Sequence, residues 1–316
     1  MNYLQILVGL ATNVPGVYRL FSRTHGTDSA RYCYSVWLRH LTMAKEHKLT
    51  DGPPPVVAEL GPGDSLGIGL AALISGTETY YAFDVVQYAN VERNLKIFDE
   101  IVDLYKRQAP VPDENEFPRV PPRLESYQFP PYLLRDGWLA AAMDPGRLQR
   151  IRGSLERMGQ GNGDTCISYV VPWDDPALIQ SKASSIDMIF SQAVLEHVDN
   201  LGLTYATFRH WLRPNGFLSH QIDFTSHRIT SEWNGHWTYQ DRLWRLMRGK
   251  RSWFLNRQPY SVHTSLLKAN HFNIVYQQLQ EDASGIQKNQ LASPFRGMSD
   301  ADLRTRAAFY QAVNKA

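Results

Sequence analysis

Residues 56–69, VVAELGPGDSLGIG, decide the fold of this chain. The segment opens with a run of apolar and β-branched residues that is typical of a buried strand, and a glycine-rich turn follows. The next residues, SLGIGLAALISG, are typical of a buried helix that ends at Gly76. A second apolar run, TYYAFDVV, occupies residues 79–86. Strand, turn, helix and strand together predict a βαβ unit with two parallel strands.

The charged residues of this unit indicate what kind of ligand it binds. The third glycine of the turn comes one residue late for the dinucleotide-binding fingerprint. Glu59 before the turn and Asp64 within it would place negative charge where a pyrophosphate needs neutral or positive surroundings. Asp84, at the end of the second strand, can accept hydrogen bonds from both hydroxyls of a ribose. We therefore expect an adenosine-containing ligand whose extension is cationic.

The alternation of helices and strands continues along the chain. An amphipathic helix is expected at 91–108 and another helix at 145–158, while seven prolines within 109–133 exclude that stretch from a sheet interior. Further strands are expected in TCISYVVPW, SSIDMIFSQ, FLSHQIDF and HFNIVYQQLQ. The fold class predicted is α/β, with a Rossmann-like sheet.

Composition restricts the partners and the compartment. The 33 Lys and Arg nearly balance the 31 Asp and Glu, so we expect no nucleic-acid partner. Two cysteines cannot form a disulfide framework, which fits a cytoplasmic location. The apolar N-terminal stretch is too short to span a bilayer, so we expect a helix packed on the body, with reversible membrane contact as the alternative. The sequence does not determine the oligomeric state.

Four stretches resemble, in the right order, the motifs of the class I S-adenosylmethionine-dependent methyltransferases: VVAELGPGDSLG, YYAFDVV, SSIDMIFSQAVLEHV and FRHWLRPNGFLSHQIDF. The resemblance covers roughly residues 55–90 and 164–280. It implies a seven-stranded, mostly parallel sheet with a late antiparallel strand and helices on both faces. It also implies S-adenosyl-L-methionine as the cofactor and methyl transfer as the activity.

The domain organisation expected from these patterns has three parts. Residues 1–54 form an N-terminal helical cover, residues 55–290 the methyltransferase domain, and residues 291–316 a C-terminal helix. The domain carries a proline-rich insertion at about 88–164 and an aromatic cap at about 224–262.

The resemblance places the cofactor at the ends of the first four strands. Asp84 would bind the ribose, Trp173 could stack on the adenine, and Asp174 would take its amino group. The other residues implied lie around the methionine moiety or next to Asp84: Glu59, Gly61, Pro62, Gly63, Val85, Ser191 and Gln192.

Three side chains near the ends of the later strands are candidates for removing a proton from the acceptor. Asp223 with His227 is the pair we favour, because a carboxylate can orient an imidazole and stabilise its protonated form. His197 is the rival base, unless it only supports the fold. The same three residues have the right chemistry for a metal, but no ligand spacing fixes a site, so we expect none.

The aromatic segment supplies candidate acceptor contacts, namely Trp233, His236, Trp237 and Arg257. Tryptophans mixed with polar groups suit sugars or planar rings, although an amphipathic helix capping the fold gives the same pattern. We expect methyl transfer to a hydroxyl or amine of a small molecule or glycan. The alternatives are an NAD(P)-dependent oxidoreductase and a non-catalytic binding protein with this fold.

Overall fold

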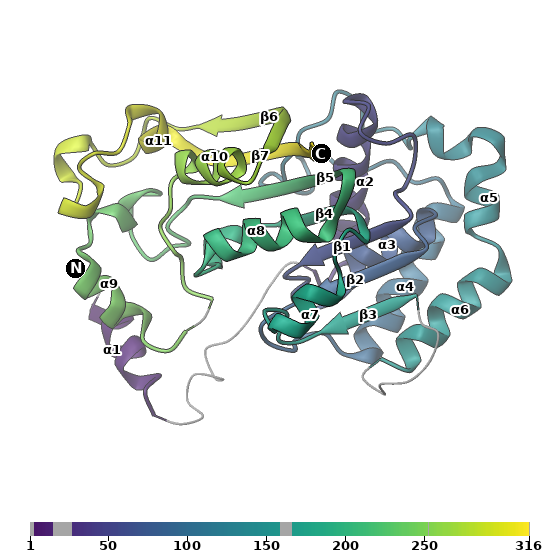
Figure 1. Ribbon diagram of the computed structural model, residues 1–316, viewed down its shortest axis with the longest axis horizontal. Helices are drawn as coiled ribbons and strands as arrows, with labels where there is room; N and C mark the ends of the chain where they lie inside the picture. Colours follow the sequence, from purple (N-terminus) through teal and green to yellow (C-terminus); the bar gives the residue numbers. More distant parts are fainter. Residues whose placement is uncertain (1–2, 15–26, 159–165, 252, 316) are drawn as a thin grey trace.

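One seven-stranded sheet organises the chain, with strand order β3-β2-β1-β4-β5-β7-β6 (Figure 1). The computed structural model describes residues 3–14, 27–158, 166–251 and 253–315. The strands are β1 (Val56–Leu60), β2 (Thr79–Phe83), β3 (Ile167–Val170), β4 (Ile186–Gln192), β5 (Leu212–Asp223), β6 (Phe272–Glu281) and β7 (Thr305–Asn314). The α-helices are α1 (Tyr3–Ala11), α2 (Ala30–Glu46), α3 (Gly67–Ser75), α4 (Val91–Lys106), α5 (Trp138–Ala142), α6 (Pro145–Glu156), α7 (Pro176–Ser181), α8 (Leu201–Trp211), α9 (Asp241–Arg248), α10 (Tyr260–Ala269) and α11 (Asp300–Arg304).

The strand directions bring several chain segments to one edge of the sheet. Strands β1 to β5 pair in parallel, so their carboxyl ends meet at that edge. Strand β7 runs antiparallel between β5 and β6, and the pairs Asp223↔Ala307 and Glu281↔Thr305 place its beginning at the same edge. In open α/β sheets the ligand sites lie at the carboxyl ends of the strands.

Helices cover both faces of the sheet, as the resemblance implied. On one face α2, α3, α4 and α6 pack around inward residues such as Val57, Tyr80 and Phe190. On the other face α8 and α10 pack on residues such as Leu60, Ile189 and Leu218. The strand order and the layers confirm the predicted fold class.

The C-terminal segment differs from the helix expected at 291–316. Among the described residues of that range, 291–315, only α11 is an α-helix, and Thr305–Asn314 form β7 in the interior of the sheet. The residues RAAFYQAVN include good helix formers and show no alternation, because both faces of this strand are buried. Pairing with β5 and β6 overrides the local preference, so this segment belongs to the sheet domain.

The proline-rich segment is held to the sheet by a buried arginine of α2. Arg39 has no exposed surface, and its guanidinium donates to the carbonyls of Pro112, Val120 and Pro122 at 2.5–2.9 Å. It also lies 3.2 Å from a carboxylate oxygen of Glu114. These bonds fix a segment that has no regular secondary structure of its own between 109 and 130.

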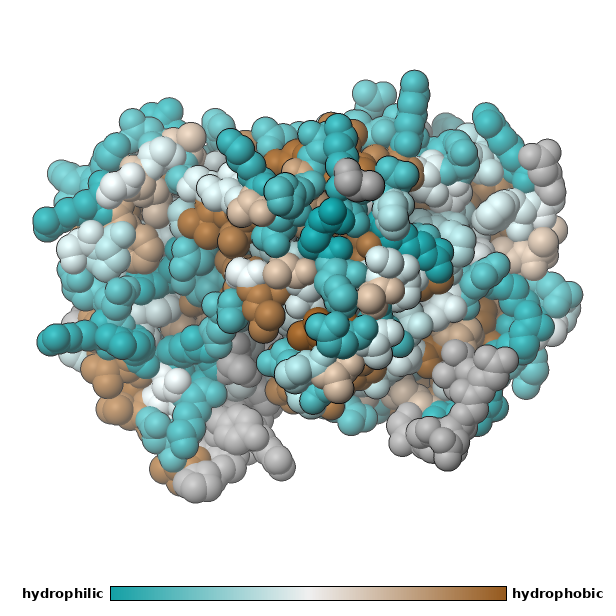
Figure 2. Space-filling model, viewed as in Figure 1, coloured by the Kyte–Doolittle hydropathy of each residue, from teal (hydrophilic) through white to brown (hydrophobic). Residues whose placement is uncertain are grey.

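The N-terminal helix α1 packs on α9. Gly9 allows this approach, because a Cβ there would lie 2.1 Å from the carbonyl oxygen of Leu246. The outer side chains Tyr3, Leu4 and Leu7 are exposed. Figure 2 shows hydrophobic residues gathered at the lower left, where α1 lies in Figure 1. Among the helices of the described residues, none is long and apolar enough to cross a bilayer.

Substitution of Arg39 tests how strongly this arginine stabilises the fold. Arg39→Met keeps most of the side-chain volume but removes the arginine donor from the buried carbonyls of Val120 and Pro122, while Pro112 keeps its bond from the Ser35 hydroxyl. We therefore expect a loss of about 3–5 kcal/mol in the free energy of unfolding. Arg31→Met is the matched control, since Arg31 also pairs with the insertion, at Glu116, but on the surface. Its loss should stay below about 1 kcal/mol. Urea denaturation measures both, and equal losses would show that the buried contacts are unimportant.

Candidate functional site

The glycine-rich turn has the conformation that its glycines predict. Gly61 and Gly63 adopt φ of 68° and 74°, and a Cβ at Gly61 would lie 2.7 Å from the Val194 side chain. Thr27 covers the turn from outside, because its hydroxyl accepts from the backbone N–H of Ser65 at 3.1 Å. Pro62, between the two glycines, is buried. The turn thus presents backbone at the carboxyl edge, directly before α3.

Glu59 does not carry the charge that we expected beside this turn. Its side chain is buried, and the Tyr80 hydroxyl donates to its Oε2 at 2.5 Å. Burial raises the pKa of this carboxyl to about 8, so it is mostly protonated at neutral pH. Glu59 therefore ties β1 to β2, and it gives no electrostatic reason against a phosphate.

Asp84 is the charged acceptor at this edge. Burial raises the pKa of its carboxyl to about 6, while backbone N–H groups of Val85, Val86 and Gly63 favour the ionised form. The N–H of Val85 donates to its Oδ1 at 2.7 Å. Val85 itself is exposed by 49% and offers an apolar surface next to the carboxylate. This combination suits the ribose and the ring of an adenosine.

Trp173 and Asp174 lie after β3 in different environments. Trp173 is only 5% exposed and packs on Trp211, with ring centroids 6.0 Å apart. It therefore belongs to the core and offers little surface for stacking on an adenine. Asp174 is exposed, as is the side chain of Val85 after β2.

Ser191 and Gln192 belong to polar contacts inside the fold. The fully buried Ser191 hydroxyl lies 2.7 Å from Nδ1 of His220. Oε1 of Gln192 lies 3.0 Å from Nε2 of His40, and its amide donates to the carbonyl of Pro121 at 3.2 Å. Gln192 thus links the end of β4 to the insertion, and Ser191 has no surface for a cofactor.

The candidate bases do meet in space. Nε2 of His227 lies 3.3 Å from Oδ2 of Asp223, and the rings of His197 and His227 are 5.1 Å apart between centroids. Burial opposes ionisation of Asp223, but its hydrogen bond and attraction to His227 hold the pKa below the usual value. Burial and the neighbouring His227 lower the pKa of His197 to about 3. The predicted Asp223–His227 pair is therefore formed, and His197 is a neutral ring beside it.

Glu196 completes this cluster and was not among the candidates from sequence. Its Oε1 accepts from the backbone N–H of Asp223 at 3.3 Å. Burial and the charge of Asp223 raise its pKa well above the usual value. Residues 195–197 form a 3₁₀ turn, and Asn256 holds that turn by donating to the carbonyls of Leu195 and Val198.

The aromatic candidates for acceptor binding are mostly interior. Trp237 has no exposed surface and donates to the carbonyl of Arg257 at 2.9 Å. Arg257 is bound to Asp241 at 2.6 Å and lies over the rings of Trp244 and Phe295. His236 is buried next to Trp237, and Trp233 is half-buried. Trp237 and Arg257 therefore stabilise the cap, and neither lines the pocket described next.

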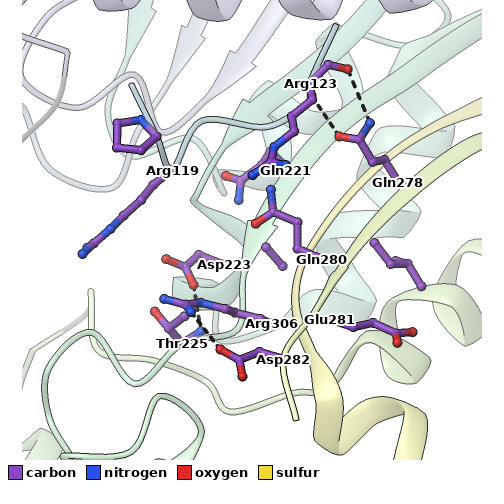
Figure 3. A pocket seen from close by; sticks show the side chains of 13 residues that line it. Arg119, Arg123, Gln221, Asp223, Thr225, Gln278, Gln280, Glu281, Asp282 and Arg306 are labelled. Atoms are coloured by element: carbon purple, nitrogen blue, oxygen red, sulfur yellow. Dashed lines mark hydrogen bonds and ion pairs between the residues drawn. The ribbon is translucent and has the colours of Figure 1, made fainter. Parts of the chain in front are cut away.

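A polar pocket of about 590 Å³ opens at the ends of β5, β6 and β7. Figure 3 shows Arg119 of the insertion on one side, with Asp223, Gln221 and Gln280 of the strands across the opening. Three arginines line it in total: Arg119, Arg123 and Arg306. Sequence reasoning missed these residues because they lie on segments far apart in the chain; only Asp223 was a candidate.

The lining of the pocket carries both hydrogen-bond donors and hydrogen-bond acceptors. Arg306 donates to Asp282 at 3.0 Å, and Gln278 accepts from the backbone of Arg123 at 2.8 Å. Arg119 forms no ion pair with any residue that the structure describes. The guanidinium of Arg123 likewise has no ion-pair partner among the described residues, so the pocket holds two such cations together with amide and carboxylate groups.

The protonation state of Glu59, beside the glycine turn, can be tested without a ligand. Because the folded-state pKa of Glu59 is raised from 4.5 to about 8, its contribution to stability is full below about pH 4.5 and is lost as pH rises towards 8. Glu59→Gln is neutral at every pH. The unfolding free energy of the wild type should therefore fall relative to that of the variant over this window, by up to about 1.4 kcal/mol per pH unit. Denaturation curves from pH 5 to 8 check this, and a constant difference would contradict it.

Comparison with known proteins adds little beyond the architecture. No family model matches the chain, and neither does any curated protein sequence. Among solved structures, the chain is similar to an S-adenosylmethionine-dependent methyltransferase from Mesorhizobium loti, at 12% identity over 87% of this chain and 97% of that one, with a TM-score of 0.40. It is also similar to phosphoethanolamine N-methyltransferase 2 from Haemonchus contortus, at 13% identity over 89% of this chain, with a TM-score of 0.43.

A third similar structure is the CurJ carbon methyltransferase, at 14% identity over 89% of this chain, with a TM-score of 0.39. The chain spans about half the length of the last two proteins, 53% and 54%. Such distant similarities carry no argument about activity. The order and directions of the seven strands give this chain the fold of the class I S-adenosylmethionine-dependent methyltransferases.

Proposed function

We propose that this protein transfers the methyl group of S-adenosyl-L-methionine to a hydroxyl, or an amine, of a small polar or glycan-type acceptor. One observation carries the proposal: the glycine turn with Asp84 and the polar pocket open at the same edge of the sheet. A methyltransferase needs this arrangement, because the sulfonium and the acceptor must be aligned across the methyl group.

The cofactor half of the proposal uses the turn and the end of β2. Asp84 would accept hydrogen bonds from the ribose hydroxyls, Val85 would contact the adenine, and Asp174 would take its amino group. The backbone at Gly61 and Gly63 would pass under the methionine moiety. When bound, the cofactor supplies an electrophilic methyl on a sulfonium; the chain's part is to hold it in place.

The acceptor half uses the polar pocket. Its glutamines, carboxylates and arginines suit a molecule with many hydroxyls, and Arg119 suits an anionic group on such a molecule. The acceptor must lose a proton when its oxygen takes the methyl. Asp223 lines the pocket and is paired with His227, so general-base assistance from this pair is part of the proposal.

Substitution of Asp84 tests the cofactor site. Asp84→Ala should weaken binding of S-adenosylhomocysteine by about 1.5–3 kcal/mol, the range for a hydrogen bond to a charged group. Asp99→Ala, at an exposed carboxylate of α4, is the control and should bind like the wild type. Calorimetry measures both. If the wild type binds NADH tightly and no adenosyl-sulfur ligand, the oxidoreductase alternative replaces the proposal.

Substitution of Arg119 tests the acceptor pocket. A screen with labelled S-adenosylmethionine against sugars, phenols and acidic glycans identifies an acceptor first. With that acceptor, Arg119→Ala should raise KM about tenfold or more and leave cofactor affinity unchanged, because an ionic hydrogen bond to the acceptor is lost. Arg107→Ala, at the exposed end of α4, serves as control. Unchanged KM in Arg119→Ala would remove this pocket from acceptor binding.

A further inference from the structure

The cluster of Glu196, His197 and His227 has the composition of a metal site. Each of the three residues offers one ligand atom, and these atoms lie within 4.8 Å of one another. They come from the turn after β4 and from the loop after β5, beside the polar pocket. Two imidazoles and one carboxylate form a donor set that transition metals use, with positions left open for other ligands.

The hydrogen bonds around the cluster leave the ligand atoms free. Oε1 of Glu196 accepts from the backbone of Asp223, while Oε2 is buried and has no hydrogen-bond partner within the described chain. Nδ1 of His197 is likewise buried and unpartnered, and the ring of His197 is hydrogen-bonded to the backbone of Trp253. Buried polar atoms without partners are rare and costly, so two of them on neighbouring residues of one cluster call for a ligand.

His227, like His197, has one ring nitrogen next to a protein hydrogen-bond partner. Its Nε2 lies 3.3 Å from Oδ2 of Asp223, so Nδ1 would be the coordinating atom in the proposed site. Metal-binding histidines commonly donate their second ring nitrogen to a carboxylate or a backbone carbonyl, and that partner orients the ring. Here Asp223 and the Trp253 carbonyl would be those partners. The side chain of His227 is 31% exposed, so its ring can move to reach metal–ligand distances of about 2.0–2.2 Å.

We infer that Glu196, His197 and His227 bind one divalent metal ion of the Zn²⁺ type, with Asp223 orienting His227. Imidazole ligands favour Zn²⁺ over Mn²⁺, Mg²⁺ and Ca²⁺, which prefer oxygen. The role of the ion rests on the proposed function and replaces general-base assistance by the Asp223–His227 pair, because His227 as a ligand has no free ring nitrogen. An acceptor hydroxyl bound to the ion would then lose its proton to water near neutral pH. Binding of the ion does not depend on that function.

Calorimetric titration tests the site directly. Tag-free full-length protein, stripped with EDTA and dialysed, is titrated with ZnCl₂, MnCl₂ and CaCl₂. We expect one Zn²⁺ per chain, bound more tightly than Mn²⁺, and Ca²⁺ bound weakest. Glu196→Gln, His197→Asn and His227→Asn should each weaken Zn²⁺ binding about tenfold or more, and Asp223→Asn by about 10–100-fold.

His271→Asn is the matched control, because His271 is exposed and shares a positive φ with His227. It should bind Zn²⁺ like the wild type. Thermal unfolding shows whether each variant is folded, and the absorption spectrum of bound Co²⁺ gives a second readout of the ligands. Absence of one-to-one binding, or equal binding by His227→Asn and His271→Asn, would overturn the inference.

Turnover assays with and without the metal ion distinguish its role in catalysis from its binding. If EDTA lowers turnover and Zn²⁺ or Mn²⁺ restores it, the ion acts on the acceptor. Undiminished turnover in stripped protein that still binds Zn²⁺ overturns this role. A protein that binds no metal but methylates its acceptor refutes the site and leaves the proposed function standing.

Discussion

The buried guanidinium of Arg39 is the contact on which the shape of the site depends. It donates hydrogen bonds to the carbonyls of Pro112, Val120 and Pro122. These bonds fix the part of the insertion at 109–130, which has no regular secondary structure of its own. Since Arg119 and Arg123 belong to this insertion, the wall of the polar pocket follows from the burial of one cation in α2. A charge buried this deeply is stable only with such a complete set of acceptors.

The position of β7 supplies the other wall. Running antiparallel between β5 and β6, it brings Arg306 and Ala307 to the edge where the parallel strands end. The turn after β4 and the loop after β5 meet at the same edge, which explains why Glu196, His197 and His227 cluster there. One edge of the sheet thus gathers the glycine turn, the pocket and the histidine cluster.

The local parts of this architecture could be predicted from the sequence. The turn at Gly61 and Gly63, the strand that ends at Asp84 and the helix α4 follow from patterns only a few residues long. Strand β7 could not be predicted in this way, because its residues suit a helix and only pairing with two distant strands makes it a strand. The charge expected at Glu59 fails for a related reason: burial in the folded chain raises its pKa, against the opposing effect of the hydrogen bond from Tyr80, and burial is not visible in a short pattern.

Short sequence patterns also predict the site only where its residues are close in the chain. The pairing of Asp223 with His227 was predictable because both follow one strand, four residues apart. The pocket was not, since its lining joins residues 118–123 to residues 278–282. Trp237 looked like a platform for an acceptor because tryptophan is common in both cores and binding sites, and only its burial distinguishes the two.

The central claim is that an adenosyl cofactor and a polar acceptor meet at this edge of the sheet. A crystal structure with S-adenosylhomocysteine tests it most directly. We expect the ribose hydroxyls within hydrogen-bonding distance of Asp84, the backbone of the glycine turn beneath the homocysteine, and the sulfur directed towards Asp223 and the pocket. A ligand bound elsewhere, or a sulfur separated from the pocket by a closed wall of side chains, would contradict the account.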